Sequence, residues 1–156
     1  MALDSFSAPV REWFDTTFAA PTPAQAEAWP AIAEGDHALV LAPTGSGKTL
    51  AAFLWALDRV MTEPPPEDPK TRTRVLYISP LRALAVDVEK NLQSPLRGIE
   101  LAAERLDETV HPVRVAIRSG DTPADERRKL MPSSMNTFSM RPVTFELTVA
   151  SLRATT

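Results

Sequence analysis

The chain has 156 residues, of which 44% are hydrophobic and 24% charged, so we expect one globular domain with a sizeable core. The formal net charge is −3, so a nucleic-acid surface would have to be a local basic patch; the absence of cysteine excludes disulfides and cysteine-based zinc sites. Because no apolar run reaches the roughly 20 residues of a membrane span and the first residues lack a signal-peptide pattern, we expect a cytoplasmic protein.

Two helices are predicted in residues 1–35. The first runs from Ser7, a possible cap, to Phe18 and puts aromatic side chains on one face, with Trp13 and Phe14 in the core. The second starts after Thr22 and ends near Gly35. Thr22 and Gln25 have the spacing of a capping box, and this spacing alone favours a structural role for Gln25. The Gln25 amide can also pair with N6 and N7 of adenine.

A glycine-rich stretch dominates the sequence. It consists of Ala42, Pro43, Thr44, Gly45, Ser46, Gly47, Lys48 and Thr49. A predicted buried strand, His37–Leu41, precedes it, and a predicted helix from Thr49 to about Met61 follows, the context of a phosphate-binding loop. Gly45 and Gly47 allow backbone N–H groups to converge on phosphate at a helix N-terminus. Lys48 would reach the β- and γ-phosphates, and the Thr49 hydroxyl would hold Mg²⁺.

Strands and helices alternate in the next part of the chain. The predicted elements are a strand at Arg74–Ser79, a helix from Pro80 to about Leu92, a helix at Ile99–Leu106, a strand at Pro112–Ile117 and a charged helix from Pro123 to about Leu130. This alternation predicts an α/β fold with a parallel sheet and helices on both faces. The three stretches expected to meet at the carboxyl ends of the strands are Thr44–Thr49, Ser79–Arg82 and Ser119–Thr122.

In this order the segments resemble the N-terminal motor lobe of superfamily 2 helicases of the DEAD/DEAH type. Phe18–Gln25 resembles the Q motif, and Pro80–Ala85 resembles motif Ia. Ala42–Thr49 resembles motif I, which usually opens with alanine in that superfamily rather than with the glycine of the general pattern. Trp29–Ile32 and Arg118–Pro123 resemble the large helicase-related proteins, which are 3′→5′ DNA helicases.

The resemblance implies an incomplete RecA-like P-loop NTPase lobe in residues 36–129, with ATP and Mg²⁺ as cofactors. It implies that residues 42–49 bind the nucleotide, that Lys48 is catalytic, and that Gln25 both contacts adenine and caps its helix. Single-stranded nucleic acid, DNA rather than RNA, would be the partner. The residues that the resemblance places on it are Arg82, Ser119 and Gly120.

Residues 130–156 do not follow the family pattern. The Asp-Glu-x-His motif is absent, and the strand that β-propensity suggests at Val143–Val149 does not match. Our hypothesis is a shift of reading frame, or a broken gene, near Lys129; the alternative is a divergent short protein. We therefore expect three parts, residues 1–35, 36–129 and 130–156. A second motor lobe is also missing.

We expect weak ATP or ADP binding at best, and neither ATPase activity nor unwinding by the isolated chain, because phosphoryl transfer also needs groups on the Walker B side. We also expect marginal stability and an apolar sheet edge open to pairing. One alternative is a non-catalytic nucleotide-binding or interaction module. Another P-loop enzyme, such as a nucleotide kinase, would leave Phe18–Gln25 and Pro80–Ala85 unexplained.

Overall fold

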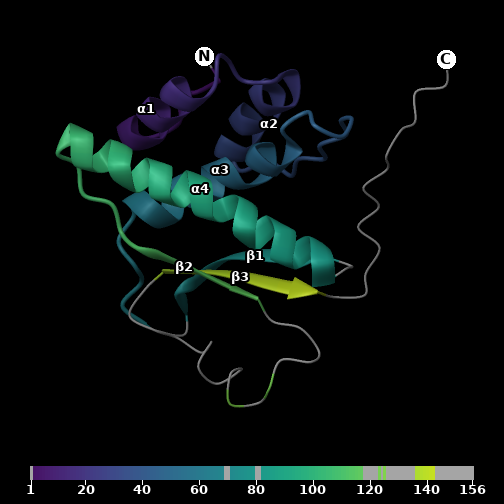
Figure 1. Cartoon of the computed structure of the whole chain (residues 1–156), viewed down its shortest axis with the longest axis vertical. Coiled ribbons are helices and arrows are strands. Elements are labelled where there is room, and N and C mark those ends of the chain that lie inside the picture. The colour runs from purple at the N-terminus through teal and green to yellow at the C-terminus, as the bar shows by residue number, and fades with distance from the viewer. Residues whose placement is uncertain are drawn as a thin grey trace.

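A parallel three-stranded sheet forms one layer of the protein (Figure 1). The computed structural model describes residues 2–68, 71–79, 82–117, 123, 125 and 136–142. Strands β1 (Thr73–Ser79) and β2 (Val113–Ile117) both pair in parallel with β3 (Asn136–Pro142), which lies between them in the order β1-β3-β2. The predicted parallel sheet is therefore confirmed for these strands.

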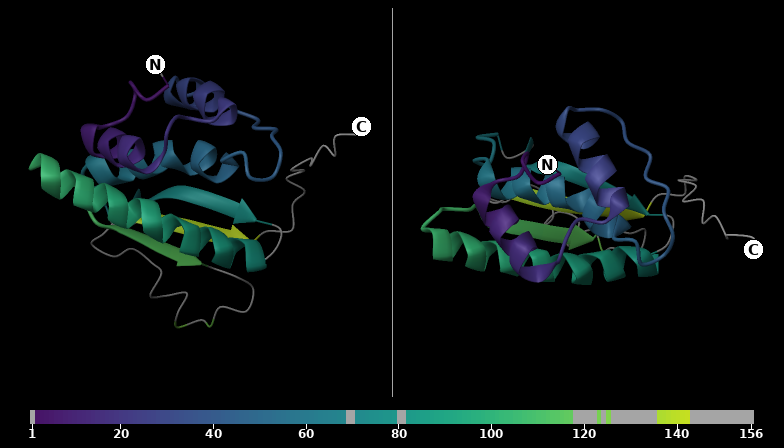
Figure 2. Two further views of the ribbon diagram at one scale, coloured as in Figure 1. Left: turned by 45° about the horizontal axis from the view of Figure 1, so that its top comes forward. Right: turned by 90° about the horizontal axis from the view of Figure 1, so that it is seen from above.

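The described helices lie on one face of this sheet, as the views in Figures 1 and 2 agree. They are α1 (Ala8–Thr17), α2 (Pro23–Ala33), α3 (Lys48–Thr62) and α4 (Arg82–Leu106). The charged helix predicted from Pro123 to about Leu130 lies almost wholly outside the described residues, so within them only one face carries helices. None of the helices among the described residues combines the length and the apolar character that a membrane span requires.

The core lies where the helices meet the sheet. Val75 and Tyr77 of β1 pack against it, whereas Leu76 and Ile78 are exposed, as the alternation of side chains along a strand requires. Trp13 and Phe14 are buried as predicted. The fully buried large side chains are Trp29, Phe14, Leu54, Leu57, Met61, Leu92, Ile99, Val10 and Val60.

Helix α4 is one continuous helix, which corrects the prediction of two helical pieces. It runs through Pro95, although proline removes a backbone hydrogen bond inside a helix. The buried residues Leu92, Leu96, Ile99 and Ala102 fall at spacings of three and four and form a single apolar face. Burial of this face favours continuation of the helix, because tertiary packing contributes more to helix stability than propensity does.

The predicted strand at His37–Leu41 is wrong, since this segment has no regular structure. The side chain of Leu39 is 78% exposed and that of Leu41 is 50% exposed. A strand forms only where its N–H and C=O groups pair with a neighbouring strand, and no strand among the described residues lies in register with this segment.

Strand β3 was not predicted, and the strand suggested at Val143–Val149 lies outside the described residues. The sequence of β3 contains Asn, Ser and a terminal Pro, and its β-propensity is weak. Its position explains why it forms: Phe138 lies opposite Val75 of β1 and Val115 of β2, so the backbone pairs on both edges. Pairing outweighs local propensity here.

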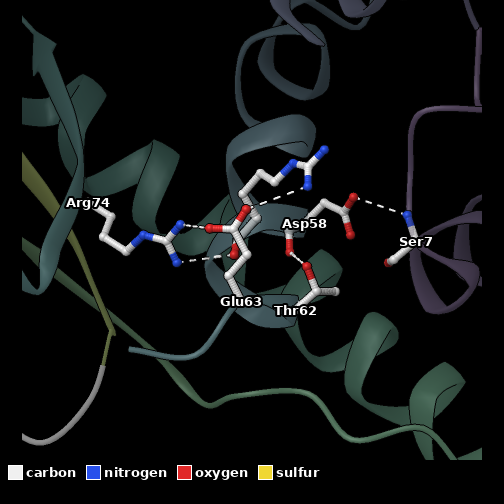
Figure 3. Close-up of polar contacts among 6 residues, drawn as sticks. Ser7, Asp58, Thr62, Glu63 and Arg74 are labelled. Carbon is white, nitrogen blue, oxygen red and sulfur yellow. Dashed lines mark hydrogen bonds and ion pairs between the residues drawn. The ribbon is translucent and has the colours of Figure 1, made fainter. Parts of the chain in front are cut away.

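A polar cluster joins α3 to its neighbours (Figure 3). Oδ2 of Asp58 accepts a hydrogen bond from the Ser7 backbone N–H at 3.1 Å, and Arg74 of β1 forms an ion pair with Glu63. Ser7 occupies the N-cap position of α1 as predicted, but its side chain makes no capping hydrogen bond. Burial raises the pKa of Asp58 above its ordinary value of 3.8, while hydrogen bonds from Ser7 and the charge of Arg59 oppose that rise.

Candidate nucleotide-binding site

The glycine-rich loop lies between α2 and α3, on the side of the molecule toward which the strands point (Figure 2). The start of α4 lies on that side too. This agrees with the expectation that ligand groups gather at the carboxyl ends of parallel strands. The loop closes as a turn, in which Ser46 donates to the Pro43 carbonyl from its backbone N–H at 3.3 Å and from its hydroxyl at 2.7 Å.

Two glycines give the loop its shape. Gly45 has φ +82° and Gly47 has φ +78°, a region that residues with a Cβ rarely adopt. Gly47 is the N-cap of α3, and a Cβ at this position would lie 2.5 Å from Nε2 of Gln25. Both the backbone angle and the close approach therefore require glycine at Gly47.

Lys48 is the first residue of α3, and its side chain folds back over the loop. Its Nζ donates to the carbonyls of Ala42 and Pro43, at 2.5 Å in each case. The ammonium group thus lies on the loop that precedes its own helix. If a phosphate bound at the helix N-terminus, the Lys48 ammonium would contact the phosphate in place of these carbonyls. The reason is that its hydrogen bond to a charged phosphate oxygen is stronger than one to a neutral carbonyl.

The donor groups of the loop fit a polyphosphate. The first N–H groups of α3 have no partner within the helix, and the helix dipole favours an anion there. Thr44 and Thr49 are exposed, so the Thr49 hydroxyl is accessible to a metal ion carried by the phosphates. No cluster of three or more acidic or histidine side chains suited to a metal ion occurs in the described ranges.

Gln25 is 3% exposed and connects α2 to the loop. Its Oε1 accepts from the Thr22 backbone N–H at 3.0 Å, and Thr22 Oγ1 accepts from the Gln25 backbone N–H at 3.4 Å, so the predicted capping box is confirmed. Nε2 of Gln25 also donates to the carbonyl of Gly47 at 3.2 Å, a contact that the sequence did not predict. Each amide atom keeps one further hydrogen-bonding position, so the cap does not exclude contact with a base.

An open cavity of about 290 Å³ adjoins Lys48 and Thr49. It separates the segment at residues 38–41 from Tyr77 of β1 and Val88 of α4. Its walls are mostly apolar aliphatic and aromatic side chains.

The predicted nucleic-acid contacts are only partly described. Arg82 begins α4, which places its backbone on the same side of the molecule as the loop. Ser119 and Gly120 follow β2 in the sequence and lie outside the described residues.

Two further contacts to the loop region were not predicted from the sequence. Thr22 Oγ1 donates to the Ser46 carbonyl at 2.9 Å, and the indole N–H of Trp29 donates to the Leu50 carbonyl at 3.3 Å. The spacing of Thr22, Gln25 and Trp29, three and then four residues apart, was the available signal, because it puts all three on one helix face.

The fold and the loop together define an α/β protein with a loop of P-loop sequence and geometry at the start of α3. A family model for DEAD/DEAH box helicases matches residues 22–151, and the chain belongs to that family. The match continues past Lys129 and covers most of residues 130–156, which were expected not to follow the family pattern.

Two curated relatives are Lhr helicases. The chain is 54% identical over 149 residues to the Lhr helicase/probable uracil glycosylase of Mycolicibacterium smegmatis, covering 96% of this chain and 10% of the relative. It is 53% identical over 131 residues to the Lhr helicase/uracil glycosylase of Escherichia coli, covering 81% of this chain and 8% of the relative. The chain thus spans about a tenth of the length of these relatives.

A solved structure of the Mycobacterium smegmatis helicase Lhr, bound to ssDNA and AMP-PNP, superimposes with a TM-score of 0.79 at 54% identity. The match covers 90% of this chain and 17% of that chain. The RecA-like helicase fold predicted from the sequence is therefore confirmed.

Proposed function

We propose that this chain is the ATP-binding part of an ATP-dependent DNA helicase. The observation that carries the proposal is the loop at residues 42–49, with two left-handed glycines and Lys48 at the first position of α3. Membership of the DEAD/DEAH family and the AMP-PNP and ssDNA bound to the similar Lhr structure support it. In the complete protein, ATP hydrolysis would be coupled to movement along single-stranded DNA.

Each predicted site residue has a role in this proposal. Residues 42–49 surround the phosphates with backbone N–H groups, and Lys48 stabilises the charge on the β- and γ-phosphates. Thr49 holds Mg²⁺, which would neutralise the phosphate oxygens when bound. Gln25 recognises the adenine edge with the donor and acceptor positions that its capping contacts leave. Arg82, Ser119 and Gly120 contact the nucleic-acid backbone.

We propose that these 156 residues bind nucleotide without hydrolysing it. Hydrolysis needs an acidic group on the Walker B side to hold Mg²⁺, a positioned water and a charge-stabilising arginine, and the sequence contains no Asp-Glu-x-His motif. A nucleotide-binding module without catalysis thus describes this chain alone. ATPase activity stimulated by nucleic acid and lost in Lys48→Ala would contradict this proposal.

The division at residue 129 also stays a proposal. The family match to residue 151 and the central position of β3 favour a divergent chain over a frameshifted one. Sequencing the coding DNA past codon 129 and translating the three frames separates these explanations, because a frame that restores Asp-Glu-x-His would establish the shift.

Nucleotide titration tests the proposed function. We expect the chain to bind a fluorescent ADP derivative, and Lys48→Ala to weaken binding roughly tenfold to a hundredfold, since a charge-assisted hydrogen bond contributes about 1.5–3 kcal/mol. The matched control is Lys90→Ala, which removes an exposed lysine of α4. Equal affinity of Lys48→Ala and the parent chain for the ADP derivative would contradict the proposal that this loop binds the nucleotide. Equal affinity for ADP and GDP contradicts the role of Gln25 in base recognition.

A further inference from the structure

Three side chains, two from α2 and one from its N-cap residue, contact backbone carbonyls around the P-loop. The Thr22 hydroxyl donates a hydrogen bond to the Ser46 carbonyl at 2.9 Å. The Gln25 amide donates to the Gly47 carbonyl at 3.2 Å, and the Trp29 indole N–H donates to the Leu50 carbonyl at 3.3 Å. All three side chains act as donors. The acceptors cover the end of the loop and the first turn of α3.

These contacts determine where the loop points its N–H groups. The peptide unit is planar, and its C=O and N–H point in opposite directions. When α2 holds the carbonyls of Ser46 and Gly47, the N–H groups of Gly47 and Lys48 are directed away from α2. Those two N–H groups are among the ones that bind phosphate in a P-loop. Contacts from the α2 side of the loop therefore orient the N–H groups on its opposite side, where an anion would bind.

Trp29 connects this arrangement to the N-terminal core. Its side chain is fully buried, and its ring contacts Phe6 and Phe14 edge to face, with centroids 5.0 and 5.5 Å apart. The indole N–H is a donor only, and when buried it needs an acceptor. The Leu50 carbonyl satisfies it, so the ring is held by packing on one side and by a hydrogen bond on the other.

We propose that Trp29 is a positioning residue for nucleotide binding, which fixes the start of α3 so that the loop is organised before phosphate arrives. This inference rests on the proposed nucleotide-binding function. Trp29 itself does not touch the nucleotide. It acts through Leu50, as Thr22 and Gln25 act through Ser46 and Gly47, and a preorganised site binds more tightly because less order is lost on binding.

Trp29→Phe tests the inference, because it removes the indole N–H and keeps a buried aromatic ring. We expect the affinity for the fluorescent ADP derivative to fall about three- to tenfold, the range for the loss of one hydrogen bond. The matched control is Trp55→Phe: Trp55 also contacts Phe6 edge to face but has Arg59 over its ring rather than a bond to the loop region. We expect less than a twofold change there.

Hydrogen exchange of the nucleotide-free chain separates positioning from general destabilisation. In Trp29→Phe, amide exchange should accelerate several-fold in residues 44–51 and stay unchanged in β1. Unchanged exchange in residues 44–51 overturns the inference, as does unchanged ADP affinity when the parent chain binds. If the parent chain does not bind ADP, the proposed function fails by itself, and the exchange result still decides whether Trp29 orders the loop.

If Trp29→Phe does not fold, Thr22 supplies the test. Thr22→Val removes the hydroxyl that donates to the Ser46 carbonyl and caps α2, whereas Thr22→Ser retains both contacts. Weaker ADP binding in Thr22→Val than in Thr22→Ser, with matching faster exchange in residues 44–51, supports orientation of the loop by α2. Equal affinity and equal exchange in both variants overturn it.

Discussion

At the scale of single residues, Asp58 is a buried ionisable side chain that lies outside the proposed nucleotide site. It is 2% exposed in α3, yet it faces Ser7 rather than the P-loop. The charged groups that act on it are Arg59, which favours the ionised carboxylate, and Glu63, which disfavours it; burial is the largest influence and raises its pKa. Asp58 therefore links α1 to α3 and has no part in the proposed chemistry.

The raised pKa predicts a pH dependence of stability. The unfolded chain ionises Asp58 near 3.8, and the folded protein ionises it only at higher pH, so between these values the folded protein binds more protons. The contribution of Asp58 to the free energy of unfolding is thus full below the unfolded pKa and is lost as pH rises through the folded pKa.

Asp58→Asn should remove this dependence, because its amide oxygen still accepts from Ser7 and carries no charge. Urea unfolding from pH 4 to pH 8 measures the pH dependence of the free energy of unfolding. As pH rises over this range the parent loses the contribution of Asp58 and the variant does not, so the free energy of unfolding of the variant relative to the parent should rise. Asp87→Asn, an exposed change in α4, is the control. A constant difference between Asp58→Asn and the parent at all pH values would show that the carboxyl titrates normally.

At the scale of elements, the contact between α1 and α4 depends on a glycine. A Cβ on Gly98 would lie 2.2 Å from Nε1 and 2.3 Å from Cδ1 of Trp13, a buried ring. The exposed ion pair between Glu12 and Arg105, at 3.7 Å, contributes little to this contact. The two helices approach closely because Gly98 has no side chain.

Gly98→Ala should therefore destabilise the protein, even though alanine favours a helix over glycine by about 0.5–1 kcal/mol. Displacing the indole costs about 1–3 kcal/mol, so we expect a net loss of up to about 2.5 kcal/mol in the free energy of unfolding. Urea denaturation measures the loss. Gln93→Ala on the exposed face of α4 should be neutral or slightly stabilising. A gain in stability from Gly98→Ala would mean that α1 and α4 are not tightly packed.

At the scale of the whole molecule, exposed apolar side chains gather around β1 and the segment before the P-loop. Leu76 is 51% exposed and Ile78 36%, and β1 has a free edge among the described strands. Leu39 is 78% exposed. An uncovered edge with apolar side chains favours pairing between chains.

We expect the chain to self-associate as its concentration rises, and Leu76→Lys to reduce this without lowering the melting temperature, because charge on an edge strand opposes pairing. Sedimentation velocity at several concentrations measures the effect. Leu101→Lys, at an exposed leucine of α4, is the control and should leave association unchanged. A parent chain that stays monomeric at high concentration and melts sharply would contradict the expectation that the edge of β1 is open to pairing between chains.

The sequence by itself determined the local features of this protein. Left-handed glycines, the capping box of Thr22 and Gln25, and the helix after the loop follow from chemistry within a few residues, and the structure has them all, with the helix starting at Lys48, one residue before its predicted start. The P-loop was predictable for this reason, since its glycines, its lysine and its helix are consecutive in the chain.

Only the tertiary structure decided the features that depend on distant partners. The segment at residues 37–41 is irregular because no neighbouring strand among the described residues satisfies its backbone, and β3 is a strand because it has a neighbour on both edges. α4 continues through Pro95 because its apolar face packs on α1, and Trp29 reaches Leu50 only once α2 lies against α3. The spacing of side chains along one segment can show which of them share a face, but it does not specify the distant segment that they contact, so these hydrogen bonds and this burial were visible only in the folded protein.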